Sequence, residues 1–185
     1  QFEKLFLHKD DLPIIKNVTM RYRRNYKRMF LKGSLKLTRL PLLRVDKEPE
    51  IVSIEDGHIF DLGGKTVKVI HTSGHTLGSV CFHIPEDRLL LTADSFNPIV
   101  LLFLTHADTV ENYIKSGEKI LSLNGIDTYY GSHLRKPISR EIIENTVGNA
   151  RYVFDNKKNR QLSLYRFSFR NKCMLVYKGN NIRNS

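Results

Sequence analysis

Three side chains of the types that bind metal ions each follow a stretch of residues that favours a β-strand. The stretches are rich in β-branched and other apolar residues, and Gly74 lets the backbone turn tightly after the first of them. His75 follows the stretch 66–70, Asp94 follows 89–92, and His133 follows 128–131. Imidazole nitrogens and carboxylate oxygens are common ligands of zinc. Three side chains able to bind a metal at three strand ends form a pattern.

The motifs around these residues read TSGHT, TADSF and YGSHL, and in this order they resemble the metallo-β-lactamase superfamily. Its usual signature has a TPGHT-like turn, a GD-type turn and a late GH turn. The resemblance implies that His75, Asp94 and His133 are ligands of a site for two zinc ions. It also implies that a metal-bound hydroxide hydrolyses a small ester, thioester or phosphodiester. Ala93 stands in place of the usual glycine, which we expect to be tolerated, and Ser132 is an additional residue in the last motif.

One motif of the superfamily is absent from this sequence. The HxHxDH motif normally supplies two histidines to one metal and an aspartate and a histidine to the other, and no H-x-H pair occurs here. Family members place that motif shortly before a segment that looks like residues 5–13, so we expect the chain to begin just after it. The remaining ligands would then be divided between two metals. We therefore expect partial or absent zinc occupancy, and a chain that is weakly active or inactive alone although its parent domain is a hydrolase.

His71 is a further histidine near the proposed ligands. It ends the stretch that leads to His75, and from there it could support the site through a hydrogen bond to a ligand. A structural role in the core or at the surface explains the same residue equally well.

The elements that must position these groups alternate between strands and helices. Glycine-containing turns from residue 51 to residue 92 predict an antiparallel meander. Further on, we expect helices that begin at Asp108 and Ser139, and a closing hairpin formed by 162–169 and 174–177. With the resemblance, this pattern predicts an α/β (α+β) fold, an αββα metallo-β-lactamase-like sandwich that is incomplete at its N-terminus. We expect a single domain over residues 1–185.

The charge of the chain is strongly positive and partly local. The formal net charge is +11, and the tract at about 18–50, which resembles a cap beside the pocket, contains the densest basic cluster. Arg23, Arg24 and Lys27 in this cluster could bind nucleic acid or an acidic partner. A degenerate, non-catalytic binding module is therefore the alternative to a hydrolase, and a solvated surface is the simplest explanation of the same charges.

The two cysteines and the hydropathy of the chain bear on its compartment. Cys81 and Cys173 lie in separate apolar stretches, which favours two buried free thiols and a reducing compartment such as the cytoplasm. We find no apolar run long enough to span a bilayer and expect no membrane partner.

The expected loss of an N-terminal portion also bears on assembly. Apolar sheet surface that this portion would cover would be left bare, and such surfaces favour association. We therefore expect a homodimer or a strand-exchanged oligomer.

Overall fold

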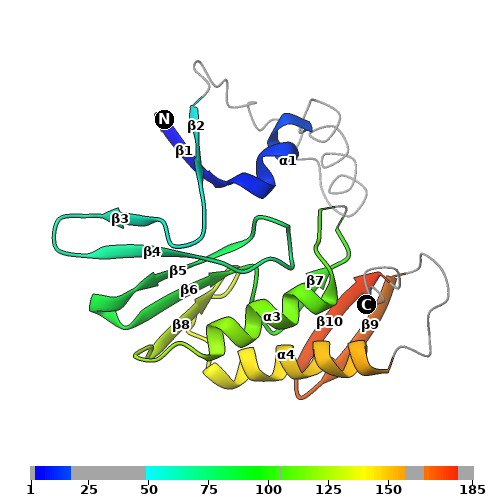
Figure 1. Cartoon of the computed structure of the whole chain (residues 1–185). Helices are drawn as coiled ribbons and strands as arrows, with labels where there is room; N and C mark the ends of the chain where they lie inside the picture. The colour runs from blue at the N-terminus through cyan, green and yellow to red at the C-terminus, as the bar shows by residue number, and fades with distance from the viewer. Residues whose placement is uncertain (1–2, 18–48, 105, 157–164, 179–185) are drawn as a thin grey trace, which may run out of the picture. The chain divides into compact units, whose positions relative to one another are not determined.

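The computed structural model describes residues 3–17, 49–104, 106–156 and 165–178 (Figure 1). The chain divides into two compact units, residues 1–54 and residues 55–185, and each is considered by itself. The expectation of a single domain over 1–185 stays a prediction. Arg23, Arg24 and Lys27 lie outside the described residues, as does most of the basic tract.

The first unit contains two parallel strands and a short helical segment. Strands β1 and β2 pair in register from Lys4 opposite Glu50 to His8 opposite Ile54. A 3₁₀ turn precedes the α-helix, and His8 caps this turn, with its Nδ1 accepting from the Asp10 N–H at 3.4 Å. The elements are β1 (Lys4–His8), η1 (Lys9–Asp11), α1 (Leu12–Asn17) and β2 (Glu50–Ile54).

The second unit contains two sheets and two long helices. The five-stranded sheet has the order β3-β4-β5-β6-β8, and the three-stranded sheet has the order β7-β10-β9. The predicted closing hairpin is confirmed. The predicted antiparallel meander is confirmed from residue 59 to residue 93, but its expected first strand is wrong, because residues 50–54 pair in parallel with β1 instead. The strands are β3 (Ile59–Asp61), β4 (Thr66–His71), β5 (Val80–Ile84), β6 (Leu89–Ala93), β7 (Ile99–Leu102), β8 (Thr128–Gly131), β9 (Tyr165–Arg170) and β10 (Cys173–Lys178). The helices are η2 (Pro85–Asp87), α3 (Val110–Leu121) and α4 (Arg140–Asp155).

The directions of three strands bring their C-terminal ends to one edge of the larger sheet. Strands β4 and β6 are both antiparallel to β5, so they run in the same direction. Strand β8 pairs with β6 in parallel, and its chain direction is therefore the same again. The turns that follow β4, β6 and β8 consequently lie at the same edge.

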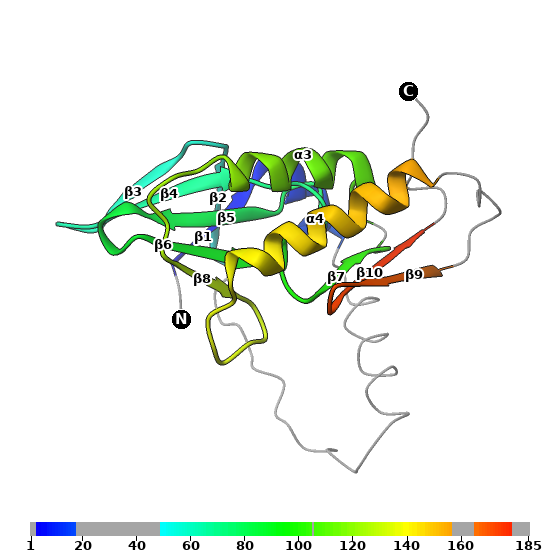
Figure 2. The ribbon, with the colours of Figure 1, turned by 90° about the horizontal axis from the view of Figure 1, so that it is seen from below.

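Helices α3 and α4 lie side by side in both views (Figures 1 and 2). Gly117 allows their close approach, since a Cβ atom at this position would lie 2.1 Å from Val147 Cγ2. The core forms between the helices and both sheets, and it includes Leu90 and Tyr129 from the larger sheet and Leu175 from the smaller one. Packing of the helices against the strands thus fixes the sheet edge that carries the three turns.

The buried face of α3 agrees with the periodicity of its sequence. Apolar or small residues recur at helical spacing along it, and the following of them are buried: Val110, Tyr113, Ile114, Gly117 and Ile120. The start of the helix differs by one residue from the prediction, because Thr109 rather than Asp108 is the N-cap. Thr109 Oγ1 accepts from the Asn112 N–H at 3.1 Å, and Asp108 instead accepts from the Thr109 N–H.

The two cysteines are free and buried, as predicted. Burial raises the pKa of the Cys81 thiol to about 12, and burial also raises the pKa of Cys173. Neither thiol is ionised near neutral pH, and only the thiolate reacts rapidly. Among the described residues, we find no helix with the length and apolar character needed to cross a bilayer.

We expect both thiols of the native protein to react negligibly with a disulfide reagent at pH 8. In guanidinium chloride, where both side chains are exposed, two equivalents per chain should react rapidly. Absorbance at the wavelength of the released thiolate measures both rates. Rapid labelling of the native protein would contradict the buried environment of Cys81 and Cys173.

Candidate metal centre

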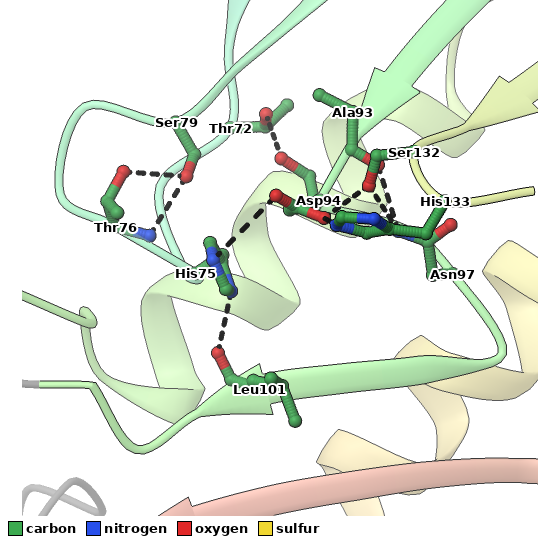
Figure 3. Close-up of polar contacts among 11 residues, drawn as sticks. Thr72, His75, Thr76, Ser79, Ala93, Asp94, Asn97, Leu101, Ser132 and His133 are labelled. Atoms are coloured by element: carbon green, nitrogen blue, oxygen red, sulfur yellow. Dashed lines mark hydrogen bonds and ion pairs between the residues drawn. The ribbon is translucent and has the colours of Figure 1, made fainter. Parts of the chain in front are cut away.

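His75, Asp94 and His133 come together at the shared edge of the larger sheet, where His75 and His133 face Asp94 from separate turns (Figure 3). Asp94 Oδ2 lies 4.0 Å from His75 Nε2, and Asp94 Oδ1 lies 3.3 Å from His133 Nε2. The exposed fractions of the side chains differ: 18% for His75, 43% for Asp94 and 84% for His133. His75 is therefore the most enclosed of the three groups, and His133 is open to solvent.

The His75 ring is oriented by a hydrogen bond on its far side. Its Nδ1 lies 3.0 Å from the carbonyl oxygen of Leu101 in β7. A carbonyl oxygen only accepts, so Nδ1 donates its proton to Leu101, and Nε2 is the ring nitrogen that could bind a cation beside Asp94. Metal-binding histidines commonly have such a bond from the other ring nitrogen. Sequence reasoning missed Leu101, because the contact is made by its backbone and leaves no signature in residue type.

The turn that carries His75 is closed by its own hydroxyl groups. Ser79 Oγ accepts from the Thr76 N–H at 2.9 Å and lies 2.8 Å from Thr76 Oγ1. The Thr72 N–H donates to the Ser79 carbonyl oxygen at 2.9 Å, which continues the pairing of β4 with β5 up to the turn. Hydrogen bonds therefore hold the segment on both sides of His75.

Gly74 fits this turn for a reason that the sequence did not reveal. A Cβ atom at this position would lie 2.6 Å from Cδ2 of Tyr113, a fully buried residue of α3. The ring of Tyr113 thus packs directly against the backbone of the turn. Helix α3 supports the His75 turn through this contact and through the hydrogen bond from Ser116 Oγ to the Ser73 carbonyl oxygen, at 2.8 Å.

Asp94 follows a residue with an unusual backbone conformation. Ala93 has φ of 47°, in the left-handed region that glycine adopts most easily. The carbonyl oxygen of Ala93 accepts from Asn97 Nδ2 and from the Ser132 N–H, both at 2.9 Å, and these bonds hold the turn. The alanine is therefore accommodated as expected, at a cost in backbone strain of roughly 1–2 kcal/mol.

Replacing Ala93 by glycine is expected to stabilise the protein by about 0.5–1 kcal/mol. The substitution relieves the left-handed strain, while the greater freedom of glycine in the unfolded chain offsets part of the gain. Urea unfolding at equilibrium measures the difference. Ala107→Gly is the control, since Ala107 is not among the residues with positive φ. Ala107→Gly is expected to lower the unfolding free energy, because glycine adds freedom to the unfolded chain and relieves no strain there. An equal loss of unfolding free energy in Ala93→Gly would contradict the strain at Ala93.

His133 lies at the end of a turn in which Ser132 makes the main contacts. The Ser132 hydroxyl forms a short hydrogen bond with Asp94 Oδ1. His133 itself has φ of 62°, and its Nε2 lies 3.3 Å from Asp94 Oδ1. Ser132, noted in the sequence only as a departure from the usual motif, thus contacts a proposed ligand directly.

His71 does not join the three converging side chains. Its Nε2 lies 2.8 Å from the carbonyl oxygen of Leu77, within the loop that follows β4. Its backbone N–H donates to Asp56 Oδ1 at 2.7 Å. These contacts brace the loop that contains His75, so any support that His71 gives the site through them is indirect.

The donor atoms fit a zinc-type cation by their chemistry and by part of their spacing. Two donors that share a tetrahedral zinc ion lie about 3.3 Å apart, and Asp94 Oδ1 lies 3.3 Å from His133 Nε2. The 4.0 Å between Asp94 Oδ2 and His75 Nε2 is longer. One carboxylate oxygen faces each imidazole, which suits a carboxylate shared by two cations. The three residues therefore fit a metal centre of this kind.

This fold and this set of donors define a class of protein, and sequence comparison agrees. The family Lactamase_B, described as the metallo-beta-lactamase superfamily, matches residues 6–133. The chain belongs to the metallo-beta-lactamase superfamily. A metallo-beta-lactamase family protein of Thermus thermophilus has a similar structure, with a TM-score of 0.56 and 20% identity, over 83% of this chain and 55% of that one. The α/β fold expected from the sequence is thereby confirmed.

Two relatives of known activity match parts of the chain. A hydroxyacylglutathione hydrolase of Rhizobium meliloti (strain 1021) is 51% identical over 103 residues, which cover 55% of this chain and 35% of the relative. An atrochrysone carboxyl ACP thioesterase of Aspergillus fumigatus is 28% identical over 114 residues, which cover 62% of this chain and 33% of the relative. The chain thus spans about a third of the length of these curated relatives.

Proposed function

We propose that this chain is part of a metal-dependent hydrolase that cleaves thioesters, with His75, Asp94 and His133 as metal ligands. The observation that carries the proposal is the convergence of two imidazoles on opposite oxygens of one carboxylate. Zinc is the cation that these donors suit. One oxygen of Asp94 faces each histidine, and this arrangement suits two ions.

A bound zinc ion would lower the pKa of a coordinated water to about 7 and polarise the carbonyl group of the substrate. The residues of this chain supply the fixed framework for that chemistry. His75 presents Nε2 because Leu101 holds the Nδ1 proton. Asp94 contributes the negative charge that compensates the cations. No nucleophilic side chain is required.

Thioesters are the substrate class that the relatives favour within the broader expectation of esters, thioesters and phosphodiesters. Both relatives described above carry names of thioester-cleaving enzymes, a glutathione thioesterase and an acyl-carrier-protein thioesterase. The stronger similarity is to the hydroxyacylglutathione hydrolase. We therefore propose a thioester of a small hydroxy acid as the preferred substrate.

The affinity of this chain for zinc is proposed to be low. The sequence has no HxHxDH motif, so each of two cations would have one histidine and a share of Asp94 from this chain. A catalytic zinc ion usually has three protein ligands. We propose partial zinc occupancy and slow turnover when the chain is studied alone.

Metal analysis and a substrate panel test this function. The full chain is dialysed with zinc and assayed with a hydroxyacyl glutathione thioester, an acyl-coenzyme A thioester and bis(4-nitrophenyl) phosphate. We expect substoichiometric zinc and slow, chelator-sensitive hydrolysis of thioesters in preference to the phosphodiester. Tight stoichiometric zinc with rapid turnover would refute the weak site, and a preference for the phosphodiester would refute the substrate class.

The binding-module alternative draws on the net charge of +11 and on Arg23, Arg24 and Lys27. Salt-dependent binding of single-stranded RNA that is lost when these three residues become glutamate would favour it. Binding that is unchanged by the charge reversal would exclude this role for the cluster.

A cytoplasmic location remains part of our proposal, supported by the two free buried thiols.

A homodimer or strand-exchanged oligomer is also proposed. Three large apolar side chains of β1 and β2, Leu5, Phe6 and Ile51, are each 42% exposed, and exposed apolar groups on paired strands favour association. Size-exclusion chromatography with light scattering measures the mass in solution. A single monomeric species at all concentrations would contradict this proposal.

A further inference from the structure

The hydroxyl group of Ser132 connects two turns that carry proposed ligands. Ser132 follows β8 and precedes His133, and its Oγ forms a hydrogen bond with Asp94 Oδ1 (Figure 3). Its backbone N–H donates to the Ala93 carbonyl oxygen at 2.9 Å. The main chain and the side chain of Ser132 thus both bind the turn after β6.

The direction of each hydrogen bond follows from which atoms carry protons. A carboxylate only accepts, so Ser132 donates its single hydroxyl proton to Asp94. The oxygen of that hydroxyl then accepts from Asn97 Nδ2, 3.4 Å away, and Asn97 Nδ2 also donates to Ala93 O at 2.9 Å. Both amide protons of Asn97 are used, and the opposite amide orientation would set its oxygen against the Ala93 carbonyl.

Asn97 has little freedom to move. It is 7% exposed, and a Cβ atom at position 131 would lie 2.0 Å from its Oδ1, so only glycine fits at Gly131 beside it. The Asn97 amide is therefore held in place, and a chain of hydrogen bonds runs from it through Ser132 to Asp94.

We propose that Ser132 is a positioning residue that holds the Asp94 carboxylate with Oδ1 toward His133 and Oδ2 toward His75. The proposal rests on the proposed role of Asp94 as a metal ligand. The Asp94 side chain is 43% exposed, and the terminal torsion of an aspartate turns easily when nothing holds it. Groups that orient metal ligands in this way typically change metal affinity by roughly 10- to 100-fold.

Zinc titration of the full chain, with Ser132→Ala and Ser132→Thr, tests the proposal. For Ser132→Ala we expect the apparent zinc dissociation constant to rise roughly 10-fold, with the Tm of the metal-free protein nearly unchanged. Threonine keeps the hydroxyl and is expected to restore affinity. Ser122→Ala is the matched control, since it removes a hydroxyl bonded to the Lys119 carbonyl oxygen at 2.7 Å in the last turn of α3. Native affinity in Ser132→Ala, or an equal loss in Ser132→Thr, would overturn the proposal.

A metal-free measurement separates this proposal from the proposed function. His75 belongs to a different turn and approaches the carboxylate through Asp94 Oδ2, so its ring reports the orientation of Asp94. We expect its ring NMR signals to shift in Ser132→Ala, to return in Ser132→Thr and to stay unchanged in Ser122→Ala. If the native chain takes up no zinc, the proposed function fails, but the NMR measurement still tests the positioning role of Ser132. Unshifted His75 signals in Ser132→Ala would refute that role.

Discussion

Replacing Asp94 by asparagine is expected to lower zinc affinity by roughly 100-fold or more and to remove metal-stimulated thioester hydrolysis. The amide has the shape of the carboxylate but not its charge, and Asp94 is the anionic group that faces both histidines. Loss of a residue that only orients a ligand lowers metal affinity by roughly 10- to 100-fold. Loss of the shared ligand itself should therefore lower the affinity by roughly 100-fold or more. Competition titration with a zinc indicator measures the affinity, and thioester absorbance measures the rate.

Asp127→Asn is the matched control for this substitution. Asp127 is an exposed carboxylate in an ion pair with Arg88, at the start of β8 and thus at the opposite end of the strand from Ser132. An exposed pair of this kind contributes little to stability, so zinc affinity and folding are expected to be nearly native. Equal zinc affinities of Asp94→Asn and the native chain would show that Asp94 is not a ligand.

Replacing Tyr113 by alanine is expected to destabilise the protein by about 3–5 kcal/mol. Tyr113 is fully buried in α3, and its ring lies 5.5 Å from that of Phe96, measured between centroids. It also packs against Gly74, so its loss leaves a cavity between the helix and the turn that carries His75. Urea unfolding followed by circular dichroism measures the change in free energy.

Tyr152→Ala provides the comparison on the neighbouring helix. Tyr152 is 46% exposed, and its ring stacks under the Arg170 guanidinium at 4.0 Å. Removing it is expected to cost about 0.5–1 kcal/mol, the usual value of an exposed cation–π contact. Similar losses for the two substitutions would mean that Tyr113 is not part of the core that supports the turn.

The strand ends of the site could be predicted from the sequence because local signals determine them. Short apolar runs predicted that His75, Asp94 and His133 each follow a strand, and the strand directions place all three at one sheet edge. The buried stripe of α3 could be read from its period for the same reason. One boundary was displaced, because Asp108 and Thr109 are both good capping residues and only the structure distinguishes them.

The contacts that hold the site could not be predicted in this way. Leu101 contributes a backbone oxygen, Asn97 donates to a serine far away in sequence, and Tyr113 packs against a glycine on another element. Each depends on segments that become neighbours only in the folded chain. Residue types at single positions carry no record of such pairs, so the support of the site became visible only in three dimensions.

The parallel position of β8 beside β6 has a consequence for the time at which the site is assembled. His75 and Asp94 lie at the ends of strands joined by short hairpins, and such local pairings form early. His133 arrives only after the intervening segment with β7 and α3 has been ordered, because a parallel strand closes a long loop. On a ribosome, the emerging polypeptide would present two donors first and the third only after β8 had docked. Under the proposed function, binding of a cation by all three groups would therefore be a late step in the maturation of this protein.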